Sequence, residues 1–222
     1  MNNSILSPPK IMLIVLVFVT ASLFGQHFQG SISLVHRTPS DTVLYKYIVS
    51  ENFVRISEIV KNKEVGNYVI VNIEESLVYE VNPSKKLYAI LPFRPISKVD
   101  TTKYRVKKTG NFHDSVGYTC YQHIVTNVNE KHQVQYWLAE DNFHFSLEFF
   151  RLMCYRNRIN EYILQIKDLE GKFPMHYEEH TILREFRMRM SVLEIKKYVP
   201  DAKLFVIPID YQLFVQHSLL VR

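Results

Sequence analysis

The stretch Phe53-Val54-Arg55-Ile56-Ser57-Glu58-Ile59, residues 53–59, decides the fold class of this 222-residue chain. Its apolar and polar side chains alternate, and a period of two places successive side chains on opposite faces of an extended strand. Val54 and Ile56 share one face, whereas Arg55 and Ser57 share the other. The segment therefore predicts a strand in a sheet with two unlike faces.

Short segments with similar character lie on both sides of this strand. They cover residues 28–36, 45–49, 68–73 (opened by Gly66 and Asn67), 77–81, 87–91, 103–108, 118–127, 132–138, 186–192 and 204–207. Turn-forming residues separate many of them, as at Asn82-Pro83-Ser84. Such serially connected strands favour an antiparallel meander, so we expect an α+β protein that is mainly antiparallel β. The tail from residue 211 shows no assignable pattern.

The period changes over about residues 141–170, where we expect a helical insert. Two sets of apolar residues have helical spacing: Phe145, Phe149, Leu152 and Met153, followed by Ile159, Tyr162, Ile163 and Ile166. Gly171 then suits a helix stop. An aromatic stripe of this kind belongs more often to a core than to a ligand-binding surface.

The first 25 residues have the pattern of a secretory signal peptide. Lys10 precedes the apolar run 11–19, and small residues follow up to Gly25. The run is shorter than the roughly 20 residues that span a bilayer, although a retained membrane anchor is the alternative. Cleavage near Gly25 leaves residues 26–222 as one domain of about 197 residues, exported to the periplasm or secreted.

The charge balance gives no evidence for a nucleic-acid partner. The net charge of +5 falls to about +4 when Lys10 is removed, which is compatible with contact to acidic membrane surfaces. Lys103, Arg105 and Lys107 fall on one face of a predicted strand, but no recognisable nucleic-acid-binding module contains them. An edge strand protected by basic side chains is the better interpretation.

The chain contains two cysteines, Cys120 and Cys154. An oxidising compartment permits a disulfide between them, and two buried free thiols are the alternative. The sequence does not reveal whether their Cα atoms lie within the roughly 7 Å that a bridge requires.

One segment resembles a catalytic motif. His176-Tyr177-Glu178-Glu179-His180 fits the His-x-x-Glu-His pattern of inverted zinc peptidases, which requires a helix. The alternation that follows favours a strand, in which the two histidines would lie roughly 13 Å apart, too far for one zinc ion. Neither a nucleophile elbow nor a phosphate-binding glycine loop occurs. We therefore expect no enzyme activity, no catalytic residue, no metal and no cofactor.

Two pairs of motifs carry a family resemblance. Residues 107–110 (KKTG) with 116–121 (VGYTCY), and residues 190–195 (MSVLEI) with 201–208 (DAKLFVIP), occur in this order. Together they resemble an uncharacterised bacterial envelope family, the domain of unknown function 4412. The pattern of strands agrees, so the resemblance covers most of the mature chain.

The resemblance implies a fold similar to that of periplasmic lipoprotein carriers. Such a fold is a curved half-barrel sheet with helices on its concave face, and the space between them accepts acyl chains. Five aromatic residues would then line this space or form packed core: Tyr136, Trp137, Phe145, Phe149 and Phe150. The leading hypothesis is a non-enzymatic envelope protein that binds an apolar or lipid-like ligand. The alternative is a structural or interaction module with a filled core and an envelope protein as its partner.

Overall fold

A computed structural model describes residues 27–92, 102–154 and 156–215, so the expected signal peptide lies outside the described residues. The strands are β1 (Gly30–Arg37), β2 (Thr42–Val49), β3 (Phe53–Val60), β4 (Lys63–Asn72), β5 (Leu77–Asn82), β6 (Leu87–Ile90), β7 (Tyr104–Ser115), β8 (Tyr118–Asn127), β9 (His132–Glu140), β10 (Lys172–Thr181), β11 (Phe186–Lys197) and β12 (Gln212–Leu213). The helices are α2 (Phe145–Met153), α3 (Ile159–Ile163) and the short 3-10 helix η2 (Ala202–Phe205).

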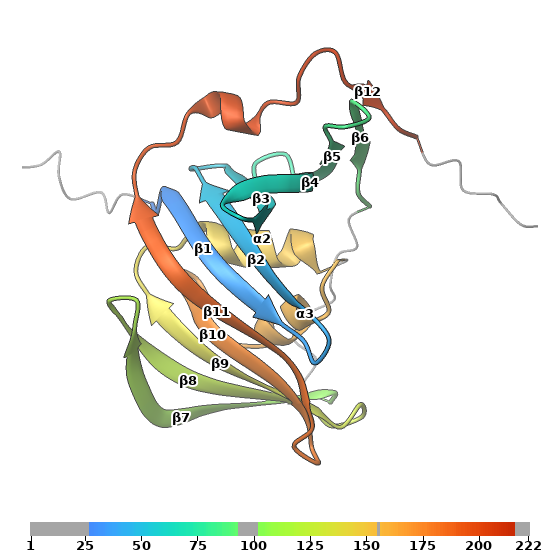
Figure 1. Cartoon of the computed structure of the whole chain (residues 1–222). Coiled ribbons are helices and arrows are strands. Elements are labelled where there is room, and N and C mark those ends of the chain that lie inside the picture. The colour runs from blue at the N-terminus through green and yellow to red at the C-terminus, as the bar shows by residue number, and fades with distance from the viewer. Residues whose placement is uncertain (1–26, 93–101, 155, 216–222) are drawn as a thin grey trace, which may run out of the picture.

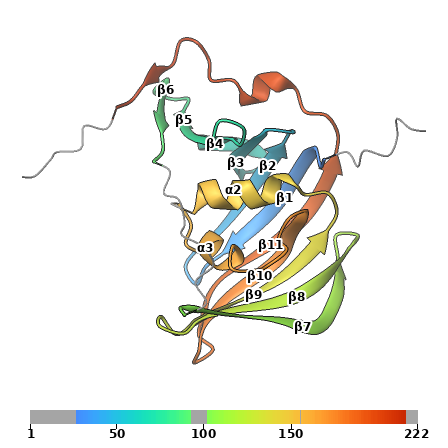
Figure 2. The ribbon, with the colours of Figure 1, turned by 180° about the vertical axis from the view of Figure 1, so that it is seen from behind.

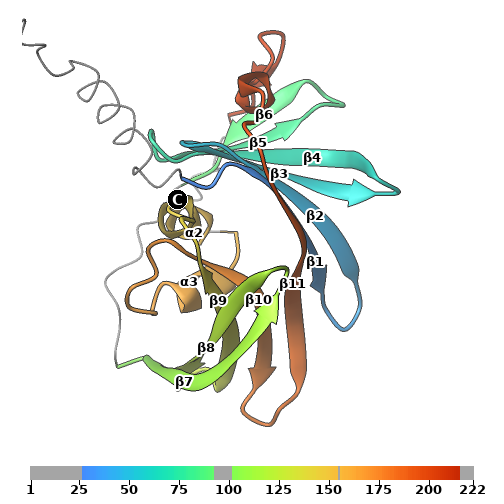
Figure 3. The same ribbon diagram turned by 90° about the vertical axis from the view of Figure 1, so that its left-hand side faces the viewer.

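All these strands form a single sheet that curves around the helices (Figure 1). Its order is β12-β6-β5-β4-β3-β2-β1-β11-β10-β9-β8-β7, and every pairing is antiparallel except that of β12 with β6. The sheet stays open, since β7 and β12 have no pairing with each other. Helices α2 and α3 lie inside the curve (Figures 2 and 3). The predicted antiparallel half-barrel with a helical insert on its concave face is confirmed.

The pairing of β1 with β11 joins the first and last long strands of the chain. Gly30 begins β1 with φ 147°, opposite Lys197. A Cβ atom at this position would lie 1.9 Å from the carbonyl oxygen of Lys196. Only glycine lets the two backbones approach this closely.

Strand β4 begins earlier than predicted, at Lys63 and not at Tyr68. Gly66 has φ 65° and sits in a bulge, because Ser57 pairs with Tyr68 whereas Glu58 pairs with Val65. The glycine therefore interrupts the register of the strand without ending it.

The predicted strand at 204–207 is wrong, because residues 202–205 form η2. The Asp201 side chain accepts a hydrogen bond from the backbone N–H of Lys203 at 2.9 Å, which caps this turn. Residues 201–214, which we call the strap, cross the convex face of β3–β6 and end in β12 (Figure 3). Beneath the strap, Phe205 stacks on Phe53 with ring centroids 5.6 Å apart.

The main core fills the concave side between sheet and helices. Side chains from the even positions of β3, such as Val54 and Ile56, meet the buried aromatic side of α2. At the far edge of the sheet, β7 exposes Arg105 and Lys107. The predicted edge strand is confirmed for Arg105 and Lys107, whereas Lys103 precedes β7 and pairs with Glu161.

Candidate ligand-binding cavity

A cavity of about 640 Å³ remains on the concave face, between the sheet and the α2–α3 segment. Strands β1–β5, β10 and β11 supply one wall, and residues from Phe149 to Asn160 supply the other. The lining residues are Leu34, His36, Tyr45, Tyr47, Ile56, Glu58, Asn67, Val69, Glu80, Phe149, Phe150, Met153, Arg156, Asn157, Asn160, Phe173, Pro174, Tyr177, Met188 and Met190.

Helix α2 positions the apolar part of the wall. Its buried residues fall on one side, so the helix presents Phe149, Phe150 and Met153 to the sheet. The Phe149 ring lies 5.6 Å from that of Tyr47, and the Phe150 ring stacks at 6.0 Å on Phe173. These rings hold the helix above the sheet, and Met188 and Met190 complete the apolar surface opposite.

Charged and amide side chains form another part of the wall. Asn67 donates a hydrogen bond to Glu80 at 3.2 Å, and Arg156 lies 3.6 Å from the same carboxylate. Glu58 also lines the cavity, next to Tyr45 across the β2–β3 pair. Burial first, and then the Glu58 carboxylate, raise the pKa of the Tyr45 hydroxyl. Polar groups therefore surround part of an otherwise apolar space.

A histidine–tyrosine pair lies on the sheet side of the cavity. The Tyr177 hydroxyl and His36 Nε2 are 3.3 Å apart. Burial lowers the pKa of His36 and raises that of Tyr177, so both side chains are neutral at pH 7. The pair adds hydrogen-bonding capacity to the wall without adding charge.

The five aromatic residues singled out in the sequence separate into three groups. Phe149 and Phe150 line the cavity. Tyr136 and Phe145 belong to the packed core, where the Tyr136 hydroxyl donates to the Ile159 carbonyl oxygen at 2.9 Å. Trp137 follows Tyr136 in β9 and lies against the His113 ring at 4.2 Å, away from the cavity.

Several lining residues were not identified from the sequence, Glu58, Arg156 and Asn160 among them. A charge within a sequence usually indicates a solvated surface. One available signal was the position of Glu58, which shares the apolar face of β3 with Val54 and Ile56.

Cys120 and Cys154 are both free thiols in this structure and form no disulfide with each other. The Cys120 Sγ donates to the Tyr118 carbonyl oxygen, and the Cys154 Sγ donates to that of Phe150. Burial raises the pKa of Cys120 to about 11 and that of Cys154 to about 12. Both thiols therefore stay protonated at neutral pH, which makes them weak nucleophiles.

The His176–His180 segment lies in β10, as the alternation predicted. His176 Nδ1 lies 2.9 Å from the Ser191 hydroxyl, and His180 Nε2 lies 3.2 Å from Glu178. Nowhere in the described part of the chain do three or more His, Cys, Asp or Glu side chains gather as a metal site would require. Within the same residues, no helix combines the length and apolar character needed to cross a membrane.

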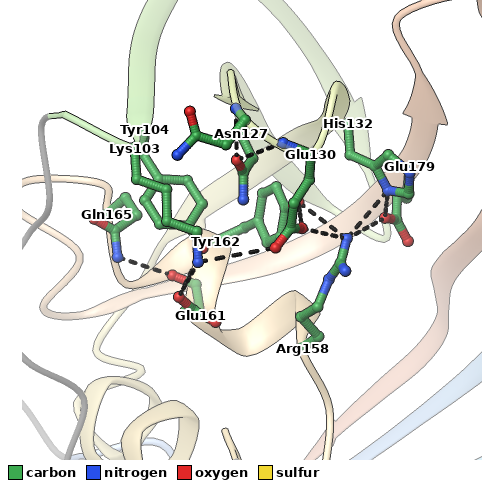
Figure 4. A network of polar contacts seen from close by, with 11 residues as sticks. Lys103, Tyr104, Asn127, Glu130, His132, Arg158, Glu161, Tyr162, Gln165 and Glu179 are labelled. Atoms are coloured by element: carbon green, nitrogen blue, oxygen red, sulfur yellow. Dashed lines mark hydrogen bonds and ion pairs between the residues drawn. The ribbon is translucent and has the colours of Figure 1, made fainter.

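A cluster of polar side chains holds α3 against the sheet (Figure 4). Arg158 lies 2.8 Å from Glu130 and 3.7 Å from Glu179. Glu161 accepts a hydrogen bond from the Tyr104 hydroxyl at 2.7 Å and also contacts Lys103, while Glu179 lies 2.7 Å from His132. Since each of these carboxylates has a partner, the cluster serves to anchor α3.

Comparison with known proteins adds a family and a fold. The family model described as domain of unknown function (DUF4412) matches residues 28–211. No curated protein matches the chain. An uncharacterized conserved protein from Thermus thermophilus is structurally similar, with 11% identity, a TM-score of 0.53, and coverage of 90% of this chain and 98% of that one.

Two further solved structures are more distant. The MucA/MucB complex of Pseudomonas aeruginosa has 12% identity and a TM-score of 0.49, over 84% of this chain and 57% of that chain. A domain described as outer membrane lipoprotein-sorting, from Vibrio parahaemolyticus, has 10% identity and a TM-score of 0.36, over 87% and 95%. At such identities, similarity concerns the fold alone.

Proposed function

The chain belongs to the family described as domain of unknown function (DUF4412), and we propose that it is an exported, non-enzymatic binding protein of the bacterial cell envelope. Its ligand is apolar or lipid-like and occupies the concave cavity between the sheet and α2. Export rests on the signal-peptide pattern of residues 1–25, which predicts a mature protein beginning near Gln26.

The size of the cavity is the observation that carries this proposal. Proteins bind small ligands in concave clefts that are lined mainly by apolar and aromatic side chains. Binding sites for small ligands typically measure about 300–1,000 Å³. The cavity of about 640 Å³ falls within this range.

The chemistry of the wall suits a flexible apolar ligand. Phenylalanine rings give a rigid apolar surface, and methionine side chains adapt to ligands of different shape. Met153, Met188 and Met190 approach the cavity from both sides, beside Phe149 and Phe150. An alkyl chain in this space would lose its contact with water, at a gain of about 0.8 kcal/mol for each buried CH₂.

Native mass spectrometry after gentle extraction tests the proposal. We expect the chain to carry bound lipid, and the delipidated protein to bind an uncharged fluorescent alkyl probe. Val69→Trp should abolish probe binding, because an indole at this lining position fills part of the cavity. Val60→Trp is the matched control, since Val60 is exposed at the end of β3 and should leave binding unchanged.

The interaction-module alternative makes the opposite prediction. A protein whose concave space serves no ligand would be recovered repeatedly without lipid. It would also fail to bind the probe, with Val69→Trp and the unmodified chain behaving alike. That combination would overturn the binding-protein proposal.

A further inference from the structure

Two polar side chains face the cavity without a partner, and they indicate more about the ligand than the cavity volume does. Asn160, at the start of α3, is only 9% exposed and lines the cavity. Its side-chain amide has no hydrogen bond with any residue of the described chain, although the Asn160 backbone groups are bonded within the α3 segment. The amide can therefore donate a hydrogen bond to, or accept one from, a polar group of a ligand in the cavity.

Glu58 is the second such group. Within the described residues, its carboxylate takes part in neither an ion pair nor a hydrogen bond. The other lining carboxylate, Glu80, is already paired with Asn67 and Arg156. Glu58 is therefore the charge that a ligand could neutralise.

The charge around the cavity is negative even though the whole chain is basic. Among the described lining residues, Glu58 and Glu80 are acidic and Arg156 is the only lysine or arginine. Near the Tyr45 hydroxyl, burial first, then the negative charges of Glu58 and Asp41, raise the pKa of that group, and Arg156 lowers it without reversing the shift. His36 adds no positive charge at pH 7, because its burial favours the neutral ring. An anionic head group would meet net repulsion here, and a cationic one would meet attraction.

We infer that the ligand is a cationic amphiphile, with its alkyl chain against Phe149, Phe150 and the methionines and its ammonium-type head group against Glu58. This inference rests on the proposed function, because it assigns a head group to the ligand of the same cavity. Asn160 supplies a hydrogen bond to the polar part of that ligand. The selectivity differs from that of a fatty-acid site, where a cation would face the carboxylate.

Calorimetric titration with three probes of equal chain length tests the head-group assignment. Dodecylammonium, dodecanol and dodecanoate are compared at pH 7.5, below their aggregation concentrations. We expect dodecylammonium to bind about tenfold more tightly than dodecanoate, with dodecanol between them. Raising the salt concentration should reduce the difference in affinity between dodecylammonium and dodecanoate, since salt screens partly solvated charges.

Substitution of Glu58 tests whether this residue causes the preference for a cationic head group. Glu58→Gln keeps the shape of the side chain and should reduce the preference for dodecylammonium over dodecanol to within about twofold. Glu51→Gln is the matched control, because Glu51 is exposed in the β2–β3 turn and its loss changes the net charge equally. The control should keep the full preference.

The outcomes separate the two proposals. If none of the three probes binds, the binding-protein proposal itself fails. If all three bind, and dodecanoate binds as tightly as dodecylammonium or more tightly, the cavity is used but the cationic assignment is wrong. An equal loss of preference in Glu51→Gln and Glu58→Gln would also overturn the assignment, because the effect would then be one of overall charge.

Discussion

The two faces of the sheet bury apolar surface in different ways. On the convex face, the strap follows the surface of β3–β6 directly, and its Phe205 ring stacks on Phe53. On the concave face, the α2 cylinder rests on phenylalanine side chains and leaves a cavity of about 640 Å³. An extended segment can follow a twisted sheet closely, whereas a straight helix touches a strongly curved sheet along only part of its length. Curvature on the helical side therefore creates the binding space.

The difference between the convex and the concave face is visible within a few residues of strand β3. Arg55, on the convex side, lies 2.7 Å from Glu64, stacks 3.8 Å above the Tyr68 ring and donates to the Leu204 carbonyl oxygen. Glu58, on the concave side, faces the cavity and has no partner among the described residues. A charge with several partners stabilises the fold, and a charge left unpaired against a cavity is available to a ligand.

The largest expected effect on stability comes from disrupting the pairing of β1 with β11, which belongs to both faces of the sheet. Gly30→Ala should cost more than about 5 kcal/mol of unfolding free energy or prevent folding, because the new Cβ overlaps the Lys196 carbonyl. Gly117→Ala is the control, since Gly117 also has a positive φ, of 81°, but nothing lies within 4 Å of the place its Cβ would take. The control should cost about 1 kcal/mol in urea denaturation. Similar losses in both variants would contradict the close approach of β1 and β11.

A pair of phenylalanine truncations compares the two faces directly. Phe143→Ala removes a ring with 0% exposure from the concave core and should cost about 4 kcal/mol. Phe205→Ala removes a ring with 8% exposure from beneath the strap and should cost about 2 kcal/mol, because water can enter the space left behind. Urea denaturation measures both. A larger loss for Phe205→Ala would show that the strap, and not the helical side, dominates stability.

The smallest expected effect concerns acid stability. Burial lowers the pKa of His36 below its unfolded value of about 6.5, so the unfolded chain binds a proton more readily. The folded state is therefore unaffected above pH 6.5 and loses stability as the pH falls below it. The slope of unfolding free energy against pH reports how many more protons the unfolded chain binds. His36→Gln should reduce this difference by up to one proton, as measured by denaturation between pH 7 and 5.

His176 provides the convex comparison for that experiment. Burial also lowers the pKa of His176; Glu178 raises it, whereas Arg189 and His113 lower it further. His176→Gln should therefore reduce the pH dependence of the unfolding free energy in the same direction as His36→Gln does. A pH dependence left unchanged by His176→Gln would mean that this histidine has the same pKa in the folded and the unfolded chain.

Local patterns predicted the strands well where alternation and turns agreed. The segments expected at 118–127 and 132–138 correspond to β8 and β9, and the left-handed Lys131, with φ 56°, ends the turn between them. Alternation alone failed at 204–207, because the Asp201 cap and the contact of Phe205 with Phe53 favour a 3-10 turn. At Gly66, the residue type suggested a boundary where the strand contains a bulge.

The sequence by itself determined the antiparallel sheet, the place of the helical insert and the strand conformation of His176–His180. These properties follow from side-chain periods of two and 3.6, which act over neighbouring residues. Only the tertiary structure decided which aromatic residues line the cavity: Phe149 and Phe150 do, whereas Tyr136, Trp137 and Phe145 do not. It also decided that Glu58 and Asn160 face the same space, although they are distant in the chain. A cavity exists only where curvature and helix placement meet, and no local pattern specifies both.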